Sequence, residues 1–105
     1  MEKLLVITRS DLPAGDQAVQ SCHVVLAFGA AHGDAERWAV AAIALLAVDD
    51  EDALVRLADR ASQRGVRVAS FREPDLGWAL TAVALEPGRD AKRLTSGLPL
   101  ALQPS

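Results

Sequence analysis

Two separated segments of this 105-residue chain carry side chains that could take part in acid–base chemistry. The first segment, residues 9–23, begins with Arg9 at the end of a predicted strand, passes through a turn and continues as a helix. That helix carries Gln20 and His23 three residues apart, a spacing that places both on neighbouring parts of one surface. An imidazole in this position could act as an acid, a base or an orienting group.

The second segment, residues 71–81, follows another predicted strand and brings two carboxylates, Glu73 and Asp75, into a loop. Pro74 lies between them and restricts the backbone of Glu73 to extended conformations, which would hold the direction of its side chain. Either carboxylate could serve as a base. The hydroxyl of Thr81, which begins the next strand, could donate to a developing oxyanion or position a water molecule. Such chemistry needs no metal and no covalent intermediate.

Each of these residues also has an ordinary structural interpretation. Apolar residues recur at helical spacing around His23, so we expect it on the apolar face of its helix, where it could be a core histidine bonded to the backbone. We interpret the adjacent Cys22 as buried packing, because neighbouring helical residues point in different directions and do not form a Cys–His pair. Glu73 and Asp75 could form and solvate a turn, and Thr81 could be an ordinary β-branched strand residue.

The elements that must position these residues follow from the apolar periodicity. The predicted order is strand 4–8, helix 16–31, short helix 35–39, strand 43–48, a helix from the acidic run at 49–52 to Gly65, strands 66–71 and 80–85, and helix 89–96. We expect strands 4–8 and 43–48 in the interior of a sheet. Strands that alternate with helices favour a three-layer α/β single domain over residues 1–105, with a mixed four-stranded sheet covered by helices on both faces.

Composition excludes several functional classes. Half of the residues are apolar and the formal net charge is −3, so the chain as a whole does not indicate nucleic-acid binding. The single cysteine cannot form an internal disulfide, and no Cys or His spacing matches a zinc site, so we expect no metal, no other cofactor and a reducing, cytoplasmic setting. The first apolar run is too short to span a bilayer, and we expect no membrane partner.

Two motifs and the order of elements carry a resemblance to a known family. The motifs are Ser10-Asp11-Leu12 with Gly15, Val19-Gln20 and His23, and the run Thr81-Ala-Val-Ala-Leu-Glu-Pro87. Over nearly the whole chain they resemble the type II peptidyl-tRNA hydrolases, and a divergent bacterial or phage-like branch in particular. Asp16 stands where that family has a Lys, and Glu73 stands where it has an Asp, in a shorter loop.

The resemblance implies hydrolysis of the ester bond of peptidyl-tRNA, with His23, Glu73, Asp75 and Thr81 as the catalytic residues and a homodimer as the assembly. Which carboxylate is the base, Glu73 or Asp75, stays open. The charge reversal at Asp16 favours an alternative, a non-catalytic tRNA- or protein-binding module that kept the fold but lost the active-site lysine. A third hypothesis is hydrolysis of another small ester or amide.

A tRNA partner requires positive charge near the site. Arg9 and Arg72, each at a strand end, are expected to bind substrate together with Gln20, and Trp78 in the loop is expected to stack on a base or a ribose. A further stripe at helical spacing consists of Arg56, Arg60 and Arg64. This stripe could contact phosphates, or it could form ordinary pairs with acidic residues of the same helix.

Overall fold

The computed structural model describes residues 2–103, the side chain of Ala35 excepted. Its elements are β1 (Lys3–Arg9), α1 (Ala14–His32), α2 (Ala35–Ala39), β2 (Ala42–Val48), α3 (Glu51–Gln63), β3 (Val68–Glu73), the 3₁₀ turn η1 (Pro74–Leu76), β4 (Ala79–Leu85) and α4 (Arg89–Thr95). The order of helices and strands is the predicted one, with η1 added in the loop that carries the candidate carboxylates.

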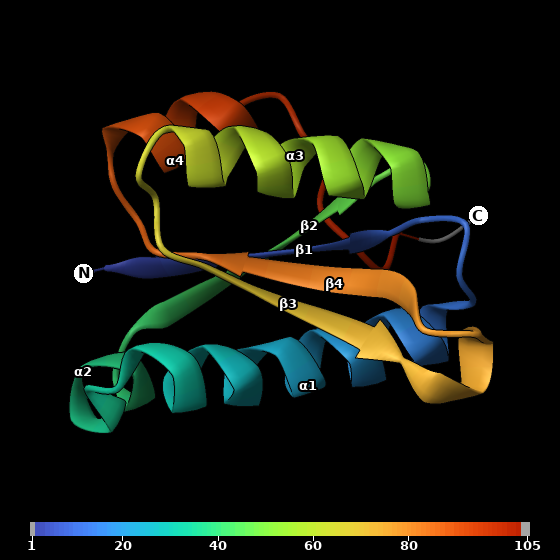
Figure 1. Cartoon of the computed structure of the whole chain (residues 1–105), viewed down its shortest axis with the longest axis horizontal. Coiled ribbons are helices and arrows are strands. Elements are labelled where there is room, and N and C mark those ends of the chain that lie inside the picture. Colours follow the sequence, from blue (N-terminus) through green and yellow to red (C-terminus); the bar gives the residue numbers. More distant parts are fainter. Residues whose placement is uncertain (1, 104–105) are drawn as a thin grey trace.

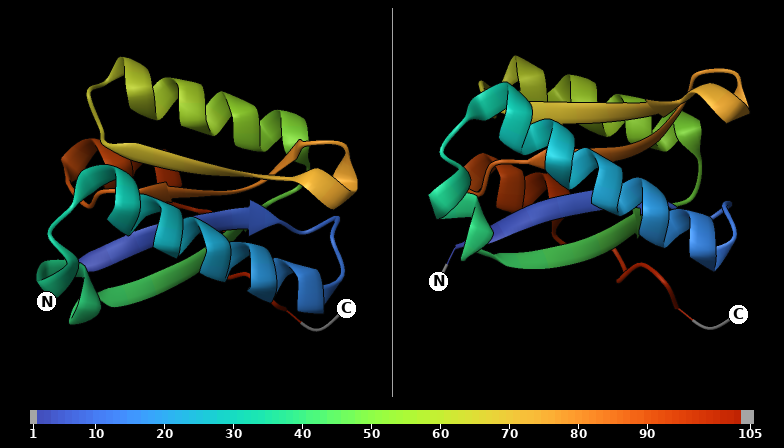
Figure 2. Two further views of the ribbon diagram at one scale, coloured as in Figure 1. Left: turned by 60° about the horizontal axis from the view of Figure 1, so that its bottom comes forward. Right: turned by 90° about the horizontal axis from the view of Figure 1, so that it is seen from below.

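One sheet lies between two layers of helices (Figure 1). The strand order is β2-β1-β4-β3. β1 pairs in parallel with β2 and antiparallel with β4, and β4 pairs antiparallel with β3, so the sheet is mixed. α1 and α2 lie on one face, where α1 crosses the strands, and α3 and α4 lie on the other (Figures 1 and 2). The predicted three-layer α/β fold is confirmed.

The two faces of the sheet have separate cores, because successive side chains of a strand point to opposite faces. On the α1 face, Leu4 and Val6 of β1 pack with Phe28 of the helix. On the other face, Ile7 packs with Leu54 of α3. Each of these side chains is at most 1% exposed, and burial of one such side chain stabilises the fold by about 1.5–3 kcal/mol. These contacts fix α1 against the strands that carry the other half of the site.

The α3 helix is positioned by the residues that the sequence indicated. The carboxylate of Asp50 accepts a hydrogen bond of 2.9 Å from the backbone N–H of Ala53, which caps the first turn. Gly65 follows the last turn with a φ of +75°, a left-handed conformation that glycine adopts without steric cost. The backbone N–H of Val66 then donates to the carbonyl of Ala61. The prediction placed the start of this strand at Val66. Because the N–H of Val66 still bonds to the end of the helix, β3 begins at Val68 instead.

The expectation that the strand at 43–48 lies inside the sheet is wrong. β2 is an edge strand that pairs with β1 alone among the named strands of residues 2–103. Its free edge is partly covered by the C-terminal segment. The N–H of Ala47 donates to the carbonyl of Pro99 at 3.0 Å, and the N–H of Ala101 donates to the carbonyl of Leu45 at 2.8 Å. A segment without regular structure thus protects this edge from pairing with another chain.

Candidate functional site

The two candidate segments meet through the side chain of Gln20. Its Nε2 donates a hydrogen bond of 3.1 Å to Oε2 of Glu73, and its Oε1 lies 3.2 Å from the hydroxyl of Thr81, whose single proton is shared between this oxygen and the carbonyl of Phe71, also at 3.2 Å. Gln20 is 5% exposed, because it lies on the side of α1 that faces the sheet. Its two polar ends therefore have partners although the side chain is buried, as a buried amide requires. One amide thus joins residues that are 53 and 61 positions away in the chain.

A β-bulge turns Thr81 toward this amide. Phe71 of β3 pairs with Ala82, whereas the next residue, Arg72, pairs with Leu80, so Thr81 is an extra residue in β4. The side chain of Leu80 lies in the core on the α3 side and that of Ala82 in the core on the α1 side. Bulges redirect single side chains in this way and are frequent beside active sites. Here the bulge lets Thr81 and Ala82 both face α1.

The carboxylate of Glu73 is held from both sides at the end of β3. Its Oε1 accepts a hydrogen bond of 3.2 Å from the backbone N–H of Asp75, and its Oε2 accepts the one from Gln20. The backbone of Glu73 is extended, with φ −91° and ψ 116°, as predicted from Pro74. The side chain is half-buried, while that of Asp75 is exposed. The structure therefore fixes the first carboxylate and leaves the second in solvent.

A shallow surface cleft of about 360 Å³ opens over these groups. Its lining consists of Asp16, Val19, Gln20, His23, Glu73, Asp75 and Leu76. The imidazole of His23 is stacked on the ring of Phe71, with 4.5 Å between ring centroids and 7° between planes. Three of the lining residues are acidic and none is a Lys or Arg, so the cleft carries negative charge.

The expected apolar face of the first helix is wrong. The side that faces the sheet carries Gln17, Gln20, Ser21, Val24 and Phe28, whereas His23 and Cys22 are exposed. The buried side tolerates polar residues because these residues form hydrogen bonds there. Nε2 of Gln17, for example, donates to the carbonyl of Leu12 at 2.8 Å. His23 is consequently not a core histidine; it lines the cleft.

The other predicted substrate-binding residues do not line the cleft. Arg9 donates to the carbonyl of Leu80 at 3.1 Å and forms an ion pair with Asp11. Arg72 donates to the carbonyl of Trp78 at 3.1 Å and thereby braces the β3–β4 loop. Trp78 has a φ of +63° and is 63% exposed. Both arginines thus have structural partners close by, and of the predicted substrate-binding residues only Gln20 lines the cleft.

Phe71 and Leu76 are site residues that the sequence interpretation missed. Phe71 carries the stacked imidazole of His23, and Leu76 contributes an exposed apolar wall. Phe71 could have been found from the strand period, because it lies two residues before Glu73 and so shares its face of β3. Leu76 has no comparable signal, since its direction depends on the 3₁₀ turn that η1 forms.

The ion pair of Arg9 with Asp11 predicts a pH dependence of stability. The hydrogen bond from Arg9 lowers the pKa of the Asp11 carboxyl below its ordinary value of 3.8. A lowered folded-state pKa stabilises the fold above the unfolded-state value, and this stabilisation is lost as the pH falls through the folded-state value. The side chain of Asp11 is 40% exposed, so solvent screens the pair and the effect is small.

We therefore expect Asp11→Asn to unfold at lower denaturant concentration than the wild type at pH 6. The difference should shrink as the pH falls below 3.8 and should also shrink in high salt. Chemical denaturation of both proteins over a pH series measures it. A difference that stays constant down to acidic pH would show that the ion pair is not its cause.

Residues 2–103 lack two features that often indicate a function. No group of three or more His, Cys, Asp or Glu side chains in this range is arranged to hold a metal ion. Within the same range, no helix has both the length and the apolar character needed to cross a membrane.

Comparison with known proteins bears on the fold. The chain matches no known protein-family model, and no protein of curated function matches it. A solved structure, described as a protein of unknown function, Atu0240, from Agrobacterium tumefaciens strain C58, is similar with a TM-score of 0.72 and 18% sequence identity. The similarity covers 93% of this chain and 96% of that one. The α/β fold therefore occurs in a second protein, and at this identity the likeness extends to the fold alone.

Proposed function

We propose that the cleft between α1 and the β3–β4 loop hydrolyses the ester bond of peptidyl-tRNA. The observation that carries this proposal is the hydrogen-bonded path from Thr81 through Gln20 to Glu73. It holds a carboxylate at the wall of the cleft in one orientation. None of the ion pairs within residues 2–103 involves Glu73, so its charge is not neutralised by a Lys or Arg there. A fixed carboxylate of this kind is suited to accept a proton.

In the proposed reaction, Glu73 takes a proton from a water molecule while the water oxygen attacks the ester carbonyl carbon. The second N–H of the Gln20 amide, which does not bond to Glu73, donates to the oxyanion that develops. The bond to the ribose oxygen then breaks, and that oxygen leaves with the proton held by Glu73. The products are the free peptide acid and tRNA with its hydroxyl restored. No metal or other cofactor takes part in this scheme.

The remaining predicted residues take supporting roles in this proposal. His23 lines the cleft beside the reacting groups, where its ring could orient the substrate. Thr81 is 0% exposed, so it acts on substrate only through Gln20 and is a positioning residue. Asp75 supplies a backbone N–H to Glu73, and its own carboxylate is in solvent. We therefore assign the base to Glu73.

A homodimer forms part of the same proposal. Apolar side chains that would favour association are exposed on α1 and on the edge strand β2. Val19 is 52% exposed, Leu26 72% and Ile43 48%.

The proposal is tested with N-acetyl-aminoacyl-tRNA as substrate. We expect the purified protein to release the N-acetyl amino acid at a rate proportional to enzyme concentration, measured by the loss of acid-precipitable label. A buffer control and heat-inactivated protein set the background. A rate at background even at high enzyme concentration would rule out the hydrolase.

A second candidate, a binding module without catalysis, is favoured by the charge of the cleft. The cleft presents negative charge from Asp16, Glu73 and Asp75. The tRNA backbone is also negative and binds cations, so this charge disfavours the entry of a tRNA substrate and thereby catalysis. Titration of labelled deacylated tRNA at low salt separates the two candidates. Salt-sensitive binding without ester hydrolysis would support the module, and hydrolysis would support the enzyme.

A further inference from the structure

Positive charge is concentrated in two segments of the chain. Residues 56–67 and 86–95 contain seven of the eleven Lys and Arg residues. The same segments contain three carboxylates, so they carry a formal charge of +4 although the whole chain carries −3. Such an imbalance within a small acidic protein indicates a surface with its own electrostatic partner.

Six of these cations lie on α3, at its end or on α4, which cover the face of the sheet opposite to α1, and Arg67 lies in the link between α3 and β3. α3 and α4 lie side by side on that face (Figure 1). The cations are Arg56, Arg60, Arg64, Arg67, Arg89, Lys92 and Arg93, and all are exposed. We call these seven residues the basic surface. Within residues 2–103, Arg67 is the one member in an ion pair, at 3.5 Å from Glu86. Six cations therefore have no carboxylate of residues 2–103 within ion-pair distance.

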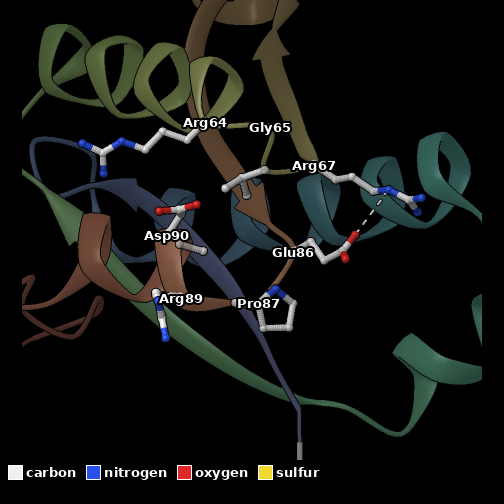
Figure 3. Close-up of a pocket in the computed structure, with 10 residues that line it drawn as sticks. Arg64, Gly65, Arg67, Glu86, Pro87, Arg89 and Asp90 are labelled. Carbon is white, nitrogen blue, oxygen red and sulfur yellow. Dashed lines mark ion pairs between the residues drawn. The ribbon is translucent and has the colours of Figure 1, made fainter.

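The arrangement of three arginines indicates the shape of the partner. Arg64, Arg67 and Arg89 surround a hollow of about 240 Å³ between the end of α3 and the start of α4. Figure 3 shows their side chains pointing in different directions, away from one another. Guanidinium groups that bind one small anion converge on it. Guanidinium groups that diverge along a rim suit an extended polyanion instead, because its charges are also separated from one another.

We propose that the basic surface binds the RNA backbone of the tRNA substrate. The choice of RNA as the partner rests on the proposed function. The physical reason is that the cations are spread over a wide surface and that, within residues 2–103, only Arg67 among them is in an ion pair. β3 connects the two regions, because Arg67 directly precedes the strand and Glu73 ends it. The Cα atoms extend over 31 × 26 × 25 Å. An RNA that contacts both the basic surface and the cleft must therefore run along the domain in the direction of β3. The basic surface thus provides the affinity that the acidic cleft cannot provide.

The test compares two double variants that change the net charge equally. Arg64→Gln with Arg89→Gln removes two positive charges from the basic surface. Ala39→Glu with Val40→Glu adds two negative charges at exposed positions at the end of α2, which lies with α1 on the opposite face. Binding of labelled deacylated tRNA is measured over a salt series. We expect the arginine variant to bind about tenfold more weakly at 0.1 M salt, with a log–log salt slope smaller by roughly 1.4–1.8, and the control to retain the wild-type slope.

Two outcomes would overturn the proposal: equal losses of tRNA binding in both variants, or no loss in either. Failure here is distinct from failure of the proposed function, because deacylated tRNA has no ester. If the arginine variant hydrolyses N-acetyl-aminoacyl-tRNA with wild-type kinetics, the proposed hydrolase is supported and the role of the basic surface is not. If the wild type hydrolyses no ester but the arginine variant loses tRNA binding, the role of the basic surface is supported and the proposed hydrolase is not.

Discussion

Glu73→Gln is expected to lower kcat for hydrolysis of N-acetyl-aminoacyl-tRNA by about 10²- to 10⁴-fold, the usual contribution of general acid–base catalysis. Gln has the shape of Glu but cannot take a proton from water. The single amide oxygen can accept from one of the two donors that hold the carboxylate, Gln20 or the N–H of Asp75, whereas the NH2 group cannot accept from the other. Because the side chain is half-buried, water can serve the donor that loses its acceptor, and we expect the thermal unfolding midpoint to fall only slightly. Single-turnover kinetics at saturating enzyme separate the chemical step from binding.

Asp75→Asn is the matched control for this prediction. It removes the same charge from the same loop, but the side chain is exposed and the backbone N–H that holds Glu73 remains. We expect kcat to stay within about threefold of the wild type, because an exposed surface substitution disturbs little. A loss as large as that of Glu73→Gln would move the base to Asp75. An active Glu73→Gln protein would exclude Glu73 as the base.

The fold was largely predictable because local signals agree with the tertiary structure. In α3, the acidic run before Glu51, the apolar positions and Gly65 all indicate the same helix, and each has its expected contact. In β4 the apolar run is continuous because the strand lies between β1 and β3 and is covered on both faces. Such elements can be predicted from one sequence because the local conformational preference of their residues agrees with their packing in the fold.

The face of α1 was not predictable, because its apolar residues do not mark its buried side. Val19 and Leu26 are 52% and 72% exposed, whereas Gln17 and Gln20 face the sheet. Gln17 and Gln20 are buried because specific acceptors and donors on other elements satisfy them. Hydrophobic periodicity carries no information on such partners. Gln20 and His23, which the sequence interpretation singled out, both line the cleft, but His23 does not lie on an apolar, buried face as expected.

The register of β4 also lies beyond the sequence. Thr81 could be identified as a strand residue, but its direction depends on a bulge between β3 and β4. A bulge is a property of the pairing of two strands, and one strand read alone does not reveal it. Without the bulge, Thr81 would face away from α1, and no path would connect it with Gln20. The candidate site is therefore a product of tertiary register more than of motif.

Thr81→Val tests whether this path positions the base. Val replaces the hydroxyl with a methyl group of similar size, so the buried Oε1 of Gln20 loses its donor. We expect a loss of about 1–3 kcal/mol in the free energy of unfolding, the usual cost of an unsatisfied buried polar group. Without that donor the amide is held at one end only, so it fixes the direction of the Glu73 carboxylate less well. A displacement of the base by about 1 Å can lower kcat roughly 10²-fold.

Thr81→Ser separates positioning from packing, because it keeps the hydroxyl and removes the methyl group. We expect Ser to restore most of kcat although it leaves a small cavity in a site that is 0% exposed. KM should change little in both variants, since Thr81 does not line the cleft. Steady-state kinetics and chemical denaturation of the two variants give both readouts. A Val variant that is destabilised but retains wild-type kcat would show that Thr81 supports the fold alone, and that Gln20 and Glu73 keep their geometry without it.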